Sequence, residues 1–273
     1  MNPNINILSL CILLSSATYA QEANFSGARN ESMAEATVAL QTNWALFTNP
    51  SGMQYQEKAF MIGYQSKYVS LGIHDGAFGF TFPIRSTALG LGVAYFGDEL
   101  LNNAKVISGI AHKIGKTSLG AKATYEQWSI RELGSKGILY VDIGGQMEIS
   151  DKVIIGMELT NLNQAKFDTM RISNPVTTVK AGLNYHPHEK LVVLAQVEKD
   201  IRNPALLRLG IEYLISPHIA VRSGVLPTPT SGYSGIGLIW PILHLDLAGS
   251  YQQEIGWSGS FSIDVPLAKR NEN

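Results

Sequence analysis

Apolar and polar positions alternate with a period of two from about residue 57 almost to the C-terminus. One of the clearest stretches alternates Leu207, Leu209 and Ile211 with Arg208 and Glu212. Because successive side chains of a β-strand point to opposite faces, this period predicts strands and not helices. We predict an all-β fold with fourteen strands, over residues 59–66, 74–83, 87–97, 104–113, 117–128, 137–148, 152–160, 176–186, 189–199, 206–214, 218–225, 231–240, 242–251 and 256–265.

The connections between the predicted strands alternate in length. Tight connections lie at 83–87, 115–116, 150–151, 187–188, 216–217 and Pro241. Longer connections lie at 98–103, 129–136, 161–175, 200–205, 226–230 and 252–255. In an outer-membrane barrel each strand crosses the bilayer, so tight turns collect at the periplasmic rim and longer loops face outward. A soluble sandwich has no reason to sort its loops in this way, although lipocalin-type barrels show a milder version.

The width of such a barrel decides which face of the strands points outward. Fourteen strands enclose too much space for a simple apolar core to fill. We therefore expect an antiparallel transmembrane β-barrel over residues 58–266, with apolar side chains facing lipid and polar ones facing the lumen, followed by a tail at 267–273. Aromatic residues near the strand ends fit the girdles of such a barrel: Tyr125, Trp128, Tyr185, Tyr213, Trp240, Tyr251 and Trp257.

Residues 1–20 have the pattern of a secretory signal peptide. An apolar stretch from Ile5 to Leu14 is followed by small and polar residues that end at Ala20. The apolar stretch is too short for an uncleaved membrane anchor, which needs about 20 apolar residues. We therefore expect export to the outer membrane of a Gram-negative bacterium.

The segment from 21 to 57 lacks the period of two, and we expect it to be a hatch that accompanies the barrel. A short helix is predicted from Glu31 to Leu40, stable only when packed against something larger because its apolar residues are small and few. Asn49, Pro50, Ser51 and Gly52 predict a turn. That turn is either a simple chain reversal or a hatch element positioned in the lumen.

Composition removes several classes of function. Charged residues make up 16% of the chain and the formal net charge is −1, so there is no basic field for nucleic acid. The single cysteine, Cys11, lies in the predicted signal peptide. A mature chain without cysteine has no thiol nucleophile, Cys-ligated zinc or iron–sulfur cluster. His186 and His188 without nearby carboxylates make a poor metal site, and we predict no cofactor.

The segment from Gly27 to Met53 resembles the start of the FadL-like outer-membrane barrels and, within them, the PorV/PorQ group of Bacteroidetes-type bacteria. The matching residues are Gly27, Ala28, Arg29, Met33, Ala34, Val38, Ala39, Leu40, Asn49, Pro50, Ser51 and Gly52. The resemblance implies an N-terminal hatch folded into the barrel. It also implies either passage of hydrophobic compounds or a role in type IX protein secretion, where PorV-like barrels hold cargo or bind the translocon. This chain departs from the family in having short outward loops.

Charged residues recur on the predicted lumen face. The set comprises Lys122, Glu126, Asp142, Glu148, Glu158, Lys180, Glu198, Arg208, Glu212, Arg222, Asp246 and Asp264. Opposite signs on adjacent strands favour an ion-paired network that braces the hatch, with Lys180, Arg208, Glu212, Arg222, Asp246 and Asp264 as its main members. The alternative is that Arg208, Glu212, Arg222 and Asp246 line a permeation path or form a catalytic cluster.

Three functions are compatible with these patterns. We predict a non-enzymatic accessory or docking component of type IX secretion or a related envelope assembly, of PorV/PorQ type. The alternative is a FadL-like channel for small hydrophobic molecules, gated by the hatch and releasing its ligand sideways into the bilayer. A third is a lipid hydrolase, which requires His244 beside a serine of 256–265. The expected partners are outer-membrane lipid with either envelope proteins or a hydrophobic small molecule, and no nucleic acid.

Overall fold

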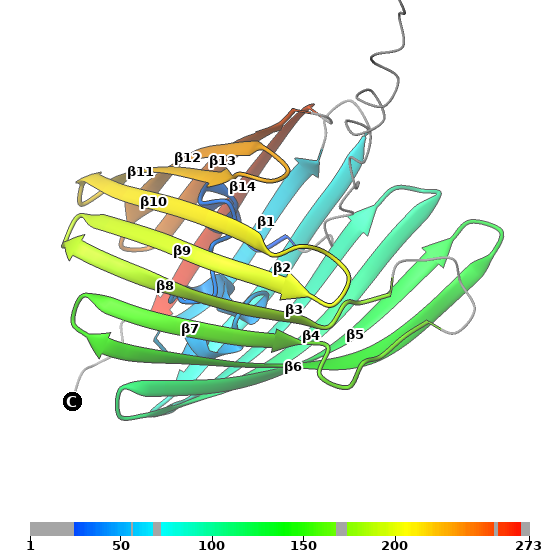
Figure 1. Cartoon of the computed structure of the whole chain (residues 1–273), viewed down its shortest axis with the longest axis horizontal. Coiled ribbons are helices and arrows are strands. Elements are labelled where there is room, and N and C mark those ends of the chain that lie inside the picture. Colours follow the sequence, from blue (N-terminus) through cyan, green and yellow to red (C-terminus); the bar gives the residue numbers. More distant parts are fainter. Residues whose placement is uncertain (1–24, 56, 68–71, 168–173, 254–255, 269–273) are drawn as a thin grey trace, which may run out of the picture.

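The chain folds into a closed antiparallel β-barrel around its N-terminal segment (Figure 1). The computed structural model describes residues 25–55, 57–67, 72–167, 174–253 and 256–268. Neighbours in the chain are neighbours in the sheet, and β1 pairs with β14 to close the barrel. The predicted signal peptide lies outside the described residues, as does most of the predicted tail. Among the described residues, no helix is both long and apolar enough to cross a membrane.

All fourteen predicted strands are present. They are β1 Lys58–Lys67, β2 Ile73–Ile84, β3 Thr87–Gly97, β4 Leu101–Ile114, β5 Thr117–Ile130, β6 Gly134–Ser150, β7 Val153–Thr160, β8 Thr178–His188, β9 Leu191–Asp200, β10 Leu206–Ser216, β11 Ile219–Leu226, β12 Ser231–Trp240, β13 Leu243–Gln252 and β14 Gly256–Ala268. The long connections predicted at 98–103 and 129–136 are wrong in extent, because the pairing of β3 with β4 and of β5 with β6 continues almost to the hairpin tips.

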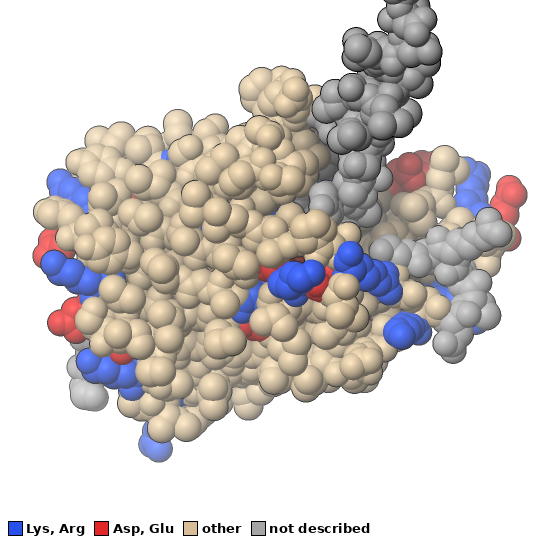
Figure 2. All heavy atoms as spheres, viewed as in Figure 1, with Lys and Arg blue, Asp and Glu red and all other residues tan. Residues whose placement is uncertain are grey.

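The barrel is inverted relative to a soluble protein, as predicted. Leu247 and Phe261 leave 49% and 40% of their surface exposed, while Asp246 and Asp264 keep 5% and 7%. On the face that Figure 2 shows, the barrel wall is largely free of charged side chains, which gather toward the strand ends. Most of the predicted girdle residues are exposed. Trp128 is an exception, since its indole donates a 2.9 Å hydrogen bond to Glu126, which is buried inside the barrel.

The wall is uneven in height between β6 and β8. Strands β4 to β6 extend beyond β7 (Figure 1), and β6 begins at Gly134 although its pairing with β7 covers only Ile143 to Ser150. Residues 161–163 take the place of a strand beside residues 139–141 of β6, which precede the part of β6 that pairs with β7. Leu162 donates its backbone N–H to Val141, and the Asn163 side chain donates to the Leu139 carbonyl and accepts from the Val141 N–H.

The N-terminal segment lies inside the barrel as a hatch, which we define as residues 25–55 (Figure 1). It contains α1 Ala28–Ser32 and the two 3₁₀ helices η1 Asn43–Leu46 and η2 Pro50–Tyr55. The predicted short helix is present in the hatch, but its bounds are wrong, because α1 covers Ala28–Ser32 and not Glu31 to Leu40. Ala34 and Glu35 adopt positive φ angles of 54° and 57°, which no α-helix contains. Contact with the barrel overrides helix propensity here, because Arg208 donates to the Ala34 carbonyl.

Candidate ligand chamber above the hatch

A row of inward-facing glycines seats the hatch against the barrel backbone. A Cβ atom at any of them would lie within 3.0 Å of a hatch atom, closer than real Cβ atoms come. This glycine belt comprises Gly63, Gly79, Gly90, Gly92, Gly109, Gly120, Gly144, Gly156, Gly182, Gly210, Gly224 and Gly235. At Gly120 the Cβ would meet the backbone of Ser51, and at Gly156 it would meet the Val38 carbonyl. The hatch therefore packs on main chain, which cannot move aside as a side chain can.

The predicted turn at Asn49 to Gly52 forms the start of η2 and anchors the hatch. Asn49 is fully buried, and its Nδ2 donates to the carbonyls of Val38 at 2.7 Å and Met157 at 3.2 Å. Its Oδ1 accepts from the N–H and the hydroxyl of Ser51. The Ser118 hydroxyl on β5 donates to the Ser51 carbonyl at 2.8 Å.

The rest of this turn completes the seat. Pro50 is buried beside the glycine belt, where a Cβ at Gly120 or Gly144 would meet it. Gly52 has no room for a side chain, because a Cβ there would lie 2.8 Å from the Leu40 carbonyl. The Pro50 contacts join the hatch to the strands, and the Gly52 contact packs the hatch on itself.

One group of lumen charges holds α1. Arg29 forms two hydrogen bonds with Glu212, of 2.9 and 2.8 Å. Arg222 joins the same carboxylate and also donates to Asp246 at 2.6 Å. Two cations and two anions therefore balance in this group, which satisfies charges that would be costly to bury alone. Asp264 lies apart from these ion pairs and accepts a 2.6 Å hydrogen bond from the indole of Trp44 in the hatch.

A second group forms a charge ladder across β5 to β10. In chain order the ladder comprises Lys122, Asp142, Glu158, Lys180, Glu198 and Arg208. The ion pairs within it are 3.1 to 3.5 Å long: Lys122 with Asp142 and Glu158, Lys180 with Glu158, and Arg208 with Glu198. Lys122 also donates to the Thr48 carbonyl, and Arg208 pairs with Glu35, so both ends of the ladder reach the hatch.

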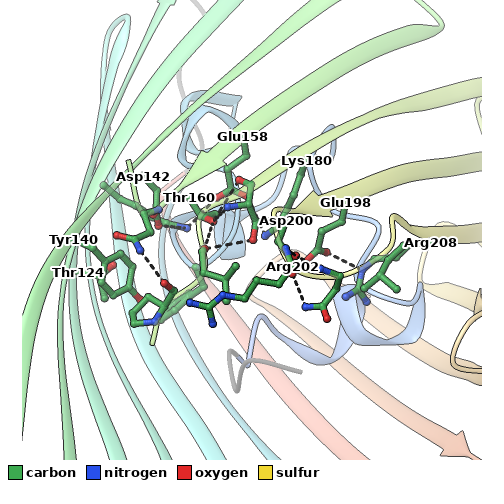
Figure 3. A pocket seen from close by; sticks show the side chains of 18 of the residues that line it. Thr124, Tyr140, Asp142, Glu158, Thr160, Lys180, Glu198, Asp200, Arg202 and Arg208 are labelled. Atoms are coloured by element: carbon green, nitrogen blue, oxygen red, sulfur yellow. Dashed lines mark hydrogen bonds and ion pairs between the residues drawn. The ribbon is translucent and has the colours of Figure 1, made fainter. Parts of the chain in front are cut away.

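The ladder forms one wall of a chamber of about 370 Å³ above the hatch (Figure 3). Phe47 of the hatch lies at its floor, and Ile107 and Leu226 add apolar surface. Arg202 and Asn203, from the connection after β9, line its mouth. The chamber therefore lies toward the end of the barrel that carries the longer connections. Its volume is within the range of small-molecule sites in proteins.

The side of the chamber nearest β6 is built by a loop. Tyr140, Asn161 and Val176 line it. The Asn161 N–H donates to Asp142 at 2.7 Å, and its Nδ2 donates to the Pro175 carbonyl at 2.8 Å. The loop is therefore tied to the charge ladder through Asp142.

Sequence reasoning identified the strand-borne charges but divided them differently from the structure. The predicted network of six falls into three places: Lys180 and Arg208 in the ladder, the ion pairs of Glu212, Arg222 and Asp246 with Arg29, and Asp264 beside Trp44. The hatch partners Arg29 and Glu35 were missed, as were the loop residues Asn161 and Asn163. The role of Arg29 could have been predicted, because a cation on a hatch inside the barrel needs an anion there.

His244 is the residue considered for a lipid hydrolase, and His186 and His188 are those considered for a metal site. His244 lies opposite Asp264, and not opposite a serine, in the β13–β14 register. Ser262 instead accepts a hydrogen bond from the Ala28 N–H. Within the residues that the structure describes, no group of three or more His, Cys, Asp or Glu side chains could hold a metal ion.

Comparison with known proteins places the fold among the FadL-like barrels. A mutant of the TodX monoaromatic hydrocarbon channel superposes with a TM-score of 0.68 at 11% identity, over 87% of this chain and 96% of the other. A FadL homologue from Pseudomonas aeruginosa gives a TM-score of 0.63 at 11% identity, over 89% and 98%. No family model matches the sequence, and no match was found among curated proteins. The chain thus has the FadL/TodX barrel fold, and the finer PorV/PorQ resemblance stays a prediction.

Proposed function

We propose that this chain is an outer-membrane channel protein that admits a small molecule from outside the cell into the chamber above the hatch. The chamber carries this proposal. It is large enough for a ligand, it lies toward the longer connections, and its floor is a hatch seated on the glycine belt. The apolar outer wall supports a location in lipid. The name of the similar TodX structures, a monoaromatic hydrocarbon channel, agrees with transport as the general task.

We further propose that the ligand leaves sideways, where residues 161–163 replace a strand beside β6. A hatch packed on main chain closes the direct route through the barrel. At the side, the wall is held by a few hydrogen bonds of Leu162 and Asn163 instead of a full strand ladder. Such a segment opens at lower cost than paired strands do, because fewer bonds must break.

Uptake into vesicles tests the channel. Purified mature chain is reconstituted into phospholipid vesicles, and entry of small labelled solutes is compared with entry into empty vesicles. Asn163→Ala removes the bonds to Leu139 and Val141 and is expected to speed uptake. Asn102→Ala, on the paired part of β4, is the matched control and is expected to leave the rate unchanged. Uptake no faster than in empty vesicles would refute the channel, and equal rates for the two variants would refute the side exit.

The docking role in type IX secretion rests on the N-terminal block of family-like residues. In this chain, members of that block have roles in seating the hatch. Gly27 leaves room for Trp44, Arg29 pairs with Glu212, and Asn49 bonds Val38 and Ser51. A hatch alone thus accounts for these residues, and the channel is preferred. Recovery of envelope proteins with the chain from mildly solubilised membranes would favour the docking role.

A further inference from the structure

The chamber carries two oppositely charged side chains that remain partly open. Lys180 on β8 and Glu198 on β9 are direct register partners. Their side chains keep 23% and 22% of their surface exposed, whereas those of Lys122, Asp142 and Glu158 keep between 2% and 6%. Figure 3 shows both Lys180 and Glu198 among the side chains that line the chamber.

Lys180 and Glu198, which we call the dyad, each form an ion pair with a further ladder residue. Lys180 pairs with Glu158 at 3.1 Å, and Glu198 pairs with Arg208 at 3.2 Å. Each is therefore held in place, while part of each side chain can still meet a ligand. Residues directly opposite on antiparallel strands have Cβ atoms about 4.5–5.5 Å apart. A positive and a negative side chain therefore face the chamber side by side.

The geometry points to a zwitterionic head with a small apolar body as the ligand class of this chamber, a proposal that rests on the proposed channel function. The ligand carboxylate contacts Lys180 and its ammonium contacts Glu198, giving two charge-assisted hydrogen bonds. The apolar body lies against Phe47, Ile107 and Leu226.

The alternatives fit this chamber less well. A hydrocarbon would remove water from Lys180 and Glu198 without replacing the lost hydrogen bonds, which is costly for charged groups. A simple anion or cation would satisfy one member of the dyad and repel the other. The chamber differs in this respect from what the words "monoaromatic hydrocarbon channel" indicate for the TodX structures.

Four probes that share a phenyl group isolate the effect of the head. L-Phenylalanine is the zwitterion, 3-phenylpropanoate the anion, 2-phenylethylamine the cation and ethylbenzene the hydrocarbon. Binding of each to the full mature chain in detergent is measured by titration calorimetry, with the heat from empty micelles subtracted. We expect phenylalanine to bind at least about tenfold more tightly than each of the others, the difference that one charge-assisted hydrogen bond supplies.

Two variants of the dyad test the assignment of each charge. Lys180→Met is expected to shift the preference toward phenylethylamine, and Glu198→Gln toward phenylpropanoate. Lys190→Met and Glu189→Gln, in the exposed turn of the same β8–β9 hairpin, are matched controls that keep the preference for phenylalanine.

Three results would overturn the proposal that the dyad binds a zwitterionic head. Ethylbenzene could bind most tightly, the dyad variants could leave the order unchanged, or none of the four probes could bind. Tightest binding of ethylbenzene would leave the channel itself intact. If nothing binds, the vesicle uptake experiment decides separately whether the chain is a channel.

Discussion

Replacing Asn49 by alanine tests whether its hydrogen bonds hold the hatch in place. The substitution removes the two bonds from Asn49 Nδ2 to strand carbonyls, of 3.2 Å to Met157 and 3.4 Å to Gly145, as well as the 2.7 Å bond to Val38 within the hatch. A lost hydrogen bond costs about 1 kcal/mol and a stranded buried donor about 1–3 kcal/mol. The Val38 carbonyl keeps a bond from Gln146, which limits the loss. Counting about 1 kcal/mol for each of the two bonds to the strands, we expect the free energy of hatch release to fall by about 2 kcal/mol.

Thiol labelling measures this release. Ser118→Cys places a thiol on β5 beside Ser51, at a fully buried position. The other cysteine of the sequence, Cys11, lies in the predicted signal peptide and is left out of the protein used for labelling. When reclosing is faster than labelling, the labelling rate follows the open population, so Asn49→Ala should raise this rate about 30-fold. Asn184→Ala is the graded control, since Asn184 is also buried and reaches the hatch through one 3.4 Å bond to Ala39. Equal labelling rates with and without Asn49→Ala would refute this account of the hatch.

Two further predictions concern the same packing. Gly156→Ala places a Cβ against the Val38 carbonyl and should lower the free energy of unfolding in urea by about 1–3 kcal/mol, whereas Gly259→Ala, which faces open space, should have a much smaller effect. Burial raises the pKa of Glu31 in α1, so ionisation of this carboxyl group opposes folding. The stability that the protonated side chain contributes at low pH is lost as the pH rises through the folded-state pKa. Glu31→Gln should therefore stabilise the chain at about pH 8 and much less at about pH 4, and a difference that does not vary with pH would contradict this.

The strands were predictable because the barrel imposes one rule on all of them. Each strand separates lipid from lumen, so a period of two recurs and the inward face of Asp246 or Arg208 follows from it. Which charged residues pair with one another was harder to predict from the sequence, because the pairs depend on the strand register. Arg222 lies opposite Glu212 in the structure, and a shift by one residue would have placed them on different faces.

The hatch conformation was not predictable from its own residues. The pattern from Glu31 to Leu40 indicates a helix, yet the chain turns at Ala34 because the barrel supplies the competing contacts there. The seat of the hatch did have a sequence signal. Glycines such as Gly144 and Gly210 occupy lumen-facing positions of strand after strand, and an absent side chain on an inward face means that something else fills that space.

The packing of the hatch on the glycine belt also affects the route by which a ligand would cross the barrel. Removing the hatch exposes its apolar core, which includes Trp44 and Leu46, and breaks the ion pairs of Arg29 together with the Asn49 bonds. Among the residues that the structure describes, opening the loop at Asn163 breaks the hydrogen bonds of Leu162 and Asn163 at the edge of β6. The opening with the lower free-energy cost would dominate, and this comparison favours the proposed side exit. The hatch is then a fixed floor, and transport should persist when it is covalently fastened to the barrel wall.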